Sequence, residues 1–195
     1  MLLWIGAGGA LAFPVVFLVD GWLRSGYSSA RHTVSALATG ARGWLQTANF
    51  ILCGLAIALG SVGLALAGPL PLAATTGVFG LGLVVSGCFP MDPMRGYPPG
   101  TAQDDPEDFS ATHRRHDAAG AVVFFVMPAM PAVLALTGEH GATRIVAAVV
   151  AAGLIAGVAA FNRAWEKDAA WTGLVQKGTL ILACAWLAAS FAVAA

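Results

Sequence analysis

The residues best suited to chemistry lie in one polar stretch, residues 89–117, of an otherwise apolar chain. Four of them can give or take protons: Asp92, His113, His116 and Asp117. Carboxyl and imidazole groups are the usual participants in general acid–base catalysis, and an apolar surrounding favours a protonated carboxyl group that can donate. The stretch therefore predicts acid–base chemistry such as a proton-initiated isomerisation or cyclisation.

Helical spacing brings three of these residues to one side of a helix. Ser110 is expected to cap a helix N-terminus, which puts His113, His116 and Asp117 in the first two turns. Ionisable residues at membrane depth usually face an interior cavity, which favours a functional site. The structural alternative is that these groups lie in interfacial water and satisfy the ends of neighbouring helices.

Two aspartates have a structural interpretation beside the functional one. Asp92 lies between Pro90 and Pro93, which restrict the backbone around it. Its carboxylate would therefore either serve as an acid or base, or cap a helix end. Asp20 lies four residues before Arg24, and an ion pair between the two is expected.

Polar residues from other parts of the chain are candidates for substrate binding at the same site. They are Asp20, His32, Ser35 and Lys177. A lysine one turn into an apolar segment, as Lys177 is, must extend to the headgroups or find a carboxylate.

Three histidines raise the question of a metal. His32, His113 and His116 would suit a catalytic zinc ion that keeps one coordination position open. Because two histidines three residues apart are weak evidence for a ligand set, no cofactor is expected, and zinc is the alternative.

The composition requires a membrane around these residues. Hydrophobic residues make up 58% of the 195-residue chain, charged residues make up 10%, and the mean hydropathy is +0.77. Such a chain has too little polar surface to cover a water-soluble globule, so a multi-pass membrane protein in a lipid bilayer is predicted. The formal net charge of zero argues against a nucleic-acid partner, which needs a basic face.

Six apolar segments are long enough to cross a hydrocarbon core of about 30 Å. They are Leu2–Val19, Trp44–Ala67, Leu70–Cys88, Ala118–Thr137, Arg144–Phe161 and Thr172–Ala194. The predicted fold is all-α, a single domain over residues 1–195 in which six transmembrane helices form a bundle. The site is expected in a pocket walled by the first, third, fourth and sixth helices.

The connections between these segments also have expected structures. A short interfacial helix is predicted over residues 30–38, with His32 and Ser35 on one stripe. The acidic loop at residues 89–112 is expected to be either a solvated hairpin or a lid over the pocket. His140, in a short connection, is expected to be solvated.

The basic residues predict the orientation in the cell membrane. Nine of the ten lie in the first, third and fifth connections or just inside the segment that follows, and only Arg144 lies on the other side. Because positively charged loops stay in the cytoplasm, these three connections are predicted to be cytoplasmic and both termini outside. The pocket would then open toward the cytoplasmic face.

Ordered motifs in the chain resemble a known family. They are Gly26-Tyr27-Ser28 with His32-Thr33-Val34-Ser35 before the second segment, Phe89-Pro90-x-Asp92-Pro93 after the third, and His116 at the start of the fourth. With six predicted spans, they are similar to the bacterial multi-pass membrane family catalogued as domain of unknown function 998. The resemblance implies that Ser35, Asp92 and His116 are the positions to watch. The family's acidic residue shortly after the serine is replaced here by Ala36.

A weaker similarity is to the membrane hydrolases that include alkaline ceramidases. In that superfamily a serine, an aspartate and three histidines surround zinc in a seven-helix bundle. This chain has six predicted helices and no histidine in the last two.

The preferred function is an integral-membrane enzyme that applies acid–base chemistry to a lipophilic substrate such as a lipid or an isoprenoid. One alternative is a zinc-dependent membrane hydrolase of the alkaline-ceramidase type, with water activated on the metal. Another is a small transporter or lipid-binding subunit in which the same residues relay protons. The polar residues gather near one membrane face, which favours a site entered from one side over alternating access.

Overall fold

Six long helices make up most of the chain in the computed structural model, which describes residues 1–138 and 141–195. They are α1 (Leu2–Leu23), α2 (Gly43–Ala67), α3 (Leu70–Cys88), α4 (Ala111–Thr137), α5 (Gly141–Glu166) and α6 (Thr172–Ala194). Each is long and apolar enough to cross a membrane, and the described residues form no strand. The predicted all-α fold with six transmembrane helices is therefore confirmed. The expectation for His140 lies outside the described residues.

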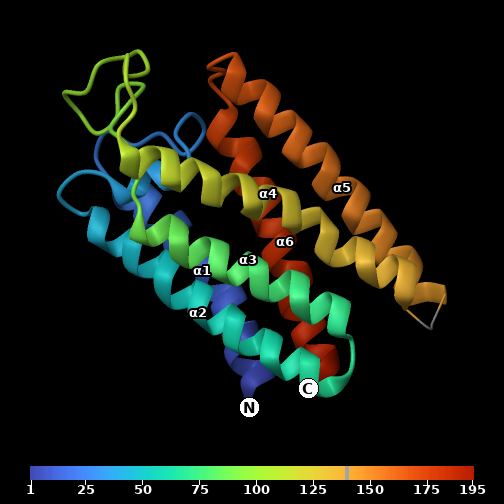
Figure 1. The fold of residues 1–195 in the computed structure, drawn as a ribbon. Coiled ribbons are helices and arrows are strands. Elements are labelled where there is room, and N and C mark those ends of the chain that lie inside the picture. The colour runs from blue at the N-terminus through green and yellow to red at the C-terminus, as the bar shows by residue number, and fades with distance from the viewer. Residues whose placement is uncertain (139–140) are drawn as a thin grey trace.

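The helices pack side by side around the bundle. α2 packs against α1 and α3, α4 packs against α3 and α5, and α6 packs against α1 and α5. Both termini lie at one end, and the connections after α1, α3 and α5 lie at the other (Figure 1). A Cβ added to Gly54 of α2 would lie 2.6 Å from the carbonyl oxygen of Gly80 in α3. Such close backbone approach is how helices associate in lipid, where no hydrophobic effect draws them together.

Three helices extend beyond the predicted apolar segments by several residues. α1 continues to Leu23, α5 continues to Glu166, and α4 begins at Ala111 rather than near Ala118. Ser110 caps α4 as predicted, because its Oγ accepts a hydrogen bond of 3.0 Å from the backbone N–H of His113. The polar residues before the apolar part of α4 therefore belong to the helix itself.

The segment between α1 and α2 differs from the interfacial helix predicted over residues 30–38. Only Ser35–Ala38 is helical, as one short 3-10 turn, and irregular turns precede it. Val34 and Leu37 are almost fully buried in the core rather than lying along a membrane surface. We refer to residues 28–39 as the inserted segment.

The inserted segment takes its conformation from α6. The carbonyl oxygens of Ala30 and Arg31 accept hydrogen bonds from the backbone N–H groups of Leu174 and Gly173. A Cβ added to Gly173 would overlap the carbonyl group of His32, so only glycine permits this approach. Backbone groups that would have closed a helix are thus bonded to another helix, which is why the predicted helix does not form.

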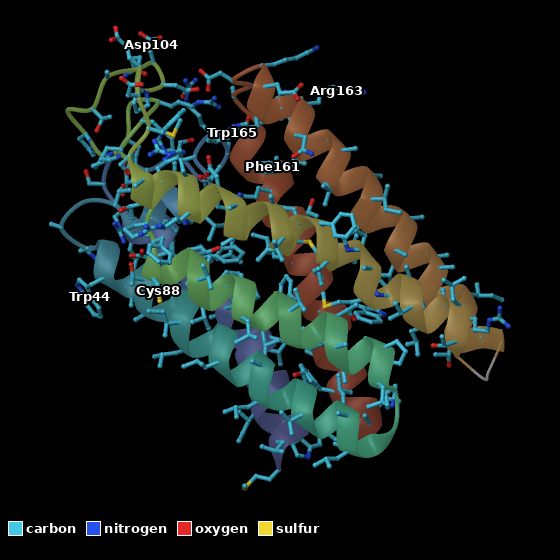
Figure 2. The ribbon with its side chains drawn as sticks, viewed as in Figure 1. Trp44, Cys88, Asp104, Phe161, Arg163 and Trp165 are labelled. Carbon is cyan, nitrogen blue, oxygen red and sulfur yellow. The ribbon has the colours of Figure 1, made fainter. Side chains whose placement is uncertain are left out.

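The acidic loop after α3 folds into a compact turn. The Arg95 guanidinium donates two hydrogen bonds of 2.6 and 2.8 Å to the carboxylate of Asp105. This pairing raises the pKa of Arg95 and lowers the pKa of Asp105. Arg95 also lies over the ring of Trp165, 3.9 Å from its centroid, which joins the loop to the end of α5. Asp104 lies at the tip of the loop, far from the helices (Figure 2).

Candidate functional site

His116 and Ser35 form a hydrogen-bonded pair inside the bundle. The Nε2 atom of His116 lies 2.9 Å from the Oγ atom of Ser35. His116 comes from the second turn of α4 and is 6% exposed, whereas Ser35 begins the 3-10 turn of the inserted segment. A hydroxyl group held against an imidazole is the arrangement of an activated serine nucleophile.

The other ring nitrogen of His116 decides the direction of this bond. Nδ1 lies 3.0 Å from the carbonyl oxygen of Ser86 and 2.8 Å from that of Phe89, at the end of α3. Carbonyl oxygens can only accept, so Nδ1 carries the proton and Nε2 of the neutral ring accepts from the Ser35 hydroxyl. The two carbonyl groups hold the imidazole in the tautomer and the orientation of a general base.

The Ser35–His116 pair lies in the wall of a pocket with a volume of about 420 Å³. The pocket is lined by α4, α5, α6, the inserted segment and Met91, and its aromatic side chains are Phe124, Phe125, Phe161 and Trp165. Figure 2 shows Phe161 and Trp165 on the side of α5 that faces α4, with Arg163 on the other side. The expected walls from the first and third helices are therefore corrected to α5. An apolar helix has the same composition whether it faces lipid or a pocket, so its neighbours cannot be told from its sequence.

Helices α1 and α3 border a different and smaller space. A cavity of about 30 Å³ lies on their side of the Ser35–His116 pair. Phe13 and Leu83, both buried, line it.

The 420 Å³ pocket reaches the surface between α4 and α5. Ala121, Phe125 and Asn162 line it and are exposed, Phe125 at 79%. Inside, the rings of Phe124 and Phe161 stack with centroids 4.9 Å apart. Since α4 and α5 are long and apolar enough to span a membrane, we expect this opening to face the surrounding lipid.

Two polar side chains of α6 hold the inserted segment, and with it Ser35, in place. Gln176 Oε1 accepts a 2.7 Å hydrogen bond from the backbone N–H of Val34. Lys177 Nζ donates to the carbonyl oxygens of Ser29 at 3.1 Å and His32 at 2.7 Å. The expectation that Lys177 must reach headgroups or a carboxylate is therefore wrong, because backbone carbonyl groups satisfy its donors at 3% exposure.

Asp92, Ser110 and His113 form a separate cluster at the start of α4, which we call the Asp92 cap. The Asp92 carboxylate accepts hydrogen bonds of 2.7 Å from both the N–H and the hydroxyl group of Ser110. The N–H of Asp92 donates to His113 Nδ1 at 2.9 Å. Slight burial works against ionisation, but the two hydrogen bonds from Ser110 outweigh it and lower the pKa of Asp92. These contacts resemble a capping box whose acidic residue comes from another segment.

His113 belongs to the Asp92 cap and not to the pocket. Because its Nδ1 accepts from Asp92, the proton lies on Nε2, which is 3.0 Å from the carboxylate of Asp117. The ring is stacked on Phe109 with centroids 4.2 Å apart. Asp117 is 62% exposed and does line the 420 Å³ pocket. Of the three residues predicted on one helix side, His116 and Asp117 border the pocket.

Asp20 lies in a buried ion cluster that lines none of these cavities. Its carboxylate is 2.5 Å from Arg24 and 3.0 Å from Arg42, so the predicted Asp20–Arg24 ion pair is confirmed. Burial disfavours the charged form of Arg24, but the hydrogen bond and the charge of Asp20 outweigh it and raise the pKa of Arg24. The cluster joins the end of α1 to the start of α2.

His32 lies apart from the other two histidines. Its Nδ1 accepts a 2.9 Å hydrogen bond from the N–H of Ser28, and its ring packs against Tyr27 and Tyr97. Burial, and after it the positive charge of Arg31, lowers the pKa of His32. Among the described residues, no three His, Cys, Asp or Glu side chains are placed to share a metal ion. The three imidazoles considered as zinc ligands are therefore not gathered around one point.

Several residues of the pocket were not among the predicted site residues. Gln176 offered a signal, because an amide within an apolar helix needs a hydrogen-bond partner inside the bundle. Phe161 offered none, since an aromatic residue near a helix end is equally common at the lipid interface.

Comparison with known proteins identifies the family. No curated protein and no solved structure matches the chain. A family model described as "Protein of unknown function (DUF998)" matches residues 7–193, a span that contains the Ser35–His116 pair, the pocket and the Asp92 cap. The chain therefore belongs to the DUF998 family, as the motifs around Ser35, Asp92 and His116 had indicated.

Proposed function

We propose that the protein is an integral-membrane enzyme in which Ser35 is the nucleophile and His116 the general base, acting on an ester with a long apolar acyl chain. The observation that carries this proposal is the 2.9 Å contact between Ser35 Oγ and His116 Nε2 in the wall of a pocket. The proposal keeps the lipophilic substrate and the proton-transfer role of His116 expected from the sequence. It replaces isomerisation or cyclisation by acyl transfer to water.

The reaction has two covalent stages. Ser35 Oγ attacks the carbonyl carbon of the ester while its proton passes to His116 Nε2. The bond to the leaving alcohol then breaks, and the imidazolium returns the proton to that alcohol. In the second stage His116 takes a proton from water, whose oxygen attacks the carbonyl carbon of the acyl-serine. The bond to Ser35 Oγ then breaks, the carboxylic acid leaves, and the imidazolium returns its proton to Ser35 Oγ. The carbonyl oxygens of Ser86 and Phe89 stabilise the transient imidazolium, a role that a carboxylate has in many serine enzymes.

The pocket lining supports a lipophilic substrate. Pockets of about 300–1,000 Å³ hold small organic ligands, and the volume here, about 420 Å³, lies within that range. Phe124, Val158 and Phe161 offer apolar surface beside the reacting pair. A molecule dissolved in the bilayer would reach Ser35 through the opening between α4 and α5 without crossing water.

Acid–base isomerisation is the second candidate, because Asp117 borders the same pocket as His116. In that case Ser35 would bind the substrate but form no covalent bond.

The zinc hydrolase has less support, since His32 lies apart from the other histidines. The transporter has less support too, because the polar residues of the pocket belong to the inserted segment, the start of α4, the end of α5 and the start of α6. These segments lie at one end of the bundle (Figure 1).

A covalent probe separates these candidates. Purified protein in lipid nanodiscs is treated with a long-chain alkyl fluorophosphonate and analysed by peptide mass spectrometry. We expect one adduct, on Ser35, that is absent in Ser35→Ala. In His116→Ala the rate of its formation should fall about 100-fold or more. Ser190→Ala is the matched control, because this hydroxyl donates to the Trp186 carbonyl oxygen and lies outside the pocket. No adduct on Ser35, with ester hydrolysis that survives Ser35→Ala, would contradict the proposal.

We also propose that the end of the bundle that holds Ser35 and His116 faces the cytoplasm. Nine of the ten basic residues lie at that end or just inside it, and cytoplasmic loops are the ones rich in Lys and Arg. In a Cys88→Ala background, an impermeant thiol reagent applied to intact cells should label Gly141→Cys but not Ala102→Cys. The reverse labelling pattern would reverse the orientation.

A further inference from the structure

Gln176 lies beside the Ser35–His116 pair, and only the oxygen of its amide group is paired among the described residues. The side chain lies on α6, is 4% exposed, and lines both the 420 Å³ pocket and the 30 Å³ cavity. Its Oε1 atom accepts the hydrogen bond from Val34, the residue directly before Ser35. Its Nε2 atom has no hydrogen-bond partner among the described residues.

The orientation of this amide is determined by its one hydrogen bond. The N–H of Val34 can only donate, so the atom that faces it must be the amide oxygen of Gln176. The NH₂ group therefore points away from Val34, and it is not among the fully buried side-chain atoms that lack a partner. Gln46 Nε2 is the one side-chain nitrogen or oxygen atom in the described part of the chain that is fully buried and has no hydrogen-bond partner.

An amide donor that lines a pocket and has no partner in the protein needs an acceptor from the contents of that pocket. The natural acceptor at this position is an oxygen atom of the molecule that occupies the pocket. In the reaction at Ser35 the oxygen that needs a donor is the ester carbonyl oxygen, which becomes negatively charged when Ser35 attacks.

We propose that Gln176 Nε2 donates a hydrogen bond to the carbonyl oxygen of the substrate and stabilises the oxyanion that forms at Ser35. This inference rests on the proposed serine reaction and adds a catalytic residue to it. The bond from Val34 to Gln176 keeps the NH₂ donor at a constant position relative to Ser35, because Val34 is the residue directly before Ser35. The substrate class is an acyl ester, whose carbonyl oxygen accepts the bond and whose chain lies along Phe124 and Phe161.

Two substitutions separate this role from a purely structural one. Gln176→Glu keeps an oxygen acceptor for Val34 and removes the NH₂ donor when the carboxyl group is ionised at alkaline pH. Gln176→Met keeps the length of the side chain and removes both the acceptor and the donor. A structural tether predicts near-normal activity for the Glu variant, whereas an oxyanion donor predicts a loss for both.

The measurement is the ratio of kcat/KM for an ester to that for the matching thionoester, in nanodiscs. Sulfur accepts hydrogen bonds poorly, so the parent should prefer the ester. Loss of an oxyanion donor costs about 10²–10³-fold in kcat, so ester hydrolysis should fall by that factor in both variants. The ester-to-thionoester ratio should fall toward one at the same time, which misfolding or a displaced Ser35 would not cause.

The outcomes are distinguishable from those of the proposed function. A parent-like ratio in both variants, with Ser35→Ala inactive, would overturn the role of Gln176 and leave Ser35 as the nucleophile. Ester hydrolysis unaffected by Ser35→Ala would overturn both proposals.

Discussion

His113 and His116 lie three residues apart on α4, and both are buried, at 2% and 6% exposure. Both ring nitrogens of His113 are engaged, Nδ1 with the N–H of Asp92 and Nε2 with the carboxylate of Asp117, and Phe109 stacks on its ring. His116 has one nitrogen on backbone carbonyl groups and the other on a hydroxyl that borders a pocket. Burial and residue type are therefore the same, and the partner separates a structural histidine from one suited to catalysis.

Asp92 and Ser35 show the same contrast between the two clusters. Each lies in a motif that the family resemblance marks as important. The carboxylate of Asp92 has its two oxygens occupied by Ser110, whereas the hydroxyl of Ser35 lines the pocket. A group already engaged at a helix end must break those bonds before it exchanges a proton with a substrate. We therefore expect the two clusters to respond differently to substitution.

The largest effect is expected at the Ser35–His116 pair. Ser35→Ala and His116→Ala should each lower kcat/KM for a long-chain ester by at least ~10³-fold, because nucleophile and base act as a unit. The corresponding change in the Asp92 cap, Ser110→Ala, should leave kcat/KM within a few-fold and lower the stability by about 1 kcal/mol. Hydrolysis rates and thermal unfolding in nanodiscs measure both. Equal losses of activity at the two serines would remove the distinction between the clusters.

The second effect concerns the contact that positions Ser35. Gly173→Ala adds a Cβ that overlaps the His32 carbonyl group, so the inserted segment must move. A displacement near 1 Å at a reacting group costs roughly 10²-fold, and we expect a fall of about 10- to 100-fold in kcat/KM. Gly178→Ala is the control, because a Cβ there meets no atom within 4 Å. Activity equal in the two variants would mean that the fit of α6 does not position Ser35.

A smaller effect is expected at Asp92. Asp92→Ala removes the acceptor for both Ser110 donors and should lower the unfolding free energy by about 1 kcal/mol, with less loss for Asp92→Asn. Hydrolysis should stay within a few-fold of the parent in both variants. If Asp92→Asn instead lost about 100-fold in activity while keeping its stability, Asp92 would be an acid or base and the capping role would be secondary.

The smallest effect is the pH dependence of the contact between the Asp92 carboxylate and Ser110. The folded pKa of Asp92 is lowered below its ordinary value of 3.8, so the native state binds fewer protons than the unfolded state in this range. The stabilisation is therefore complete above that value and is lost as the pH falls through the lower folded pKa. The stability difference between the parent and Asp92→Asn should shrink when the pH is lowered from about 5 to about 3. A difference that stays constant over this range would show that the Asp92 charge does not stabilise the cap.

Local features of the sequence determined the helices and their ends. Each of the six apolar runs is long enough to cross a bilayer, and in lipid a single chain segment must satisfy its own backbone groups, so each run is a helix. Ser110 caps α4, and Asp20 pairs with Arg24, because both contacts join residues three or four positions apart.

Contacts between distant residues were decided by the tertiary structure alone. Ser35 and His116 are 81 positions apart, and no local pattern links them. The inserted segment has a helical pattern in its sequence, yet its backbone bonds to Gly173 and Lys177 of α6, which outcompete its own helix. The sequence by itself thus determined which residues are helical and which could react. Packing of α4, α5 and α6 decided which of them share a pocket, because helices in lipid associate through shape and hydrogen bonds that no single segment encodes.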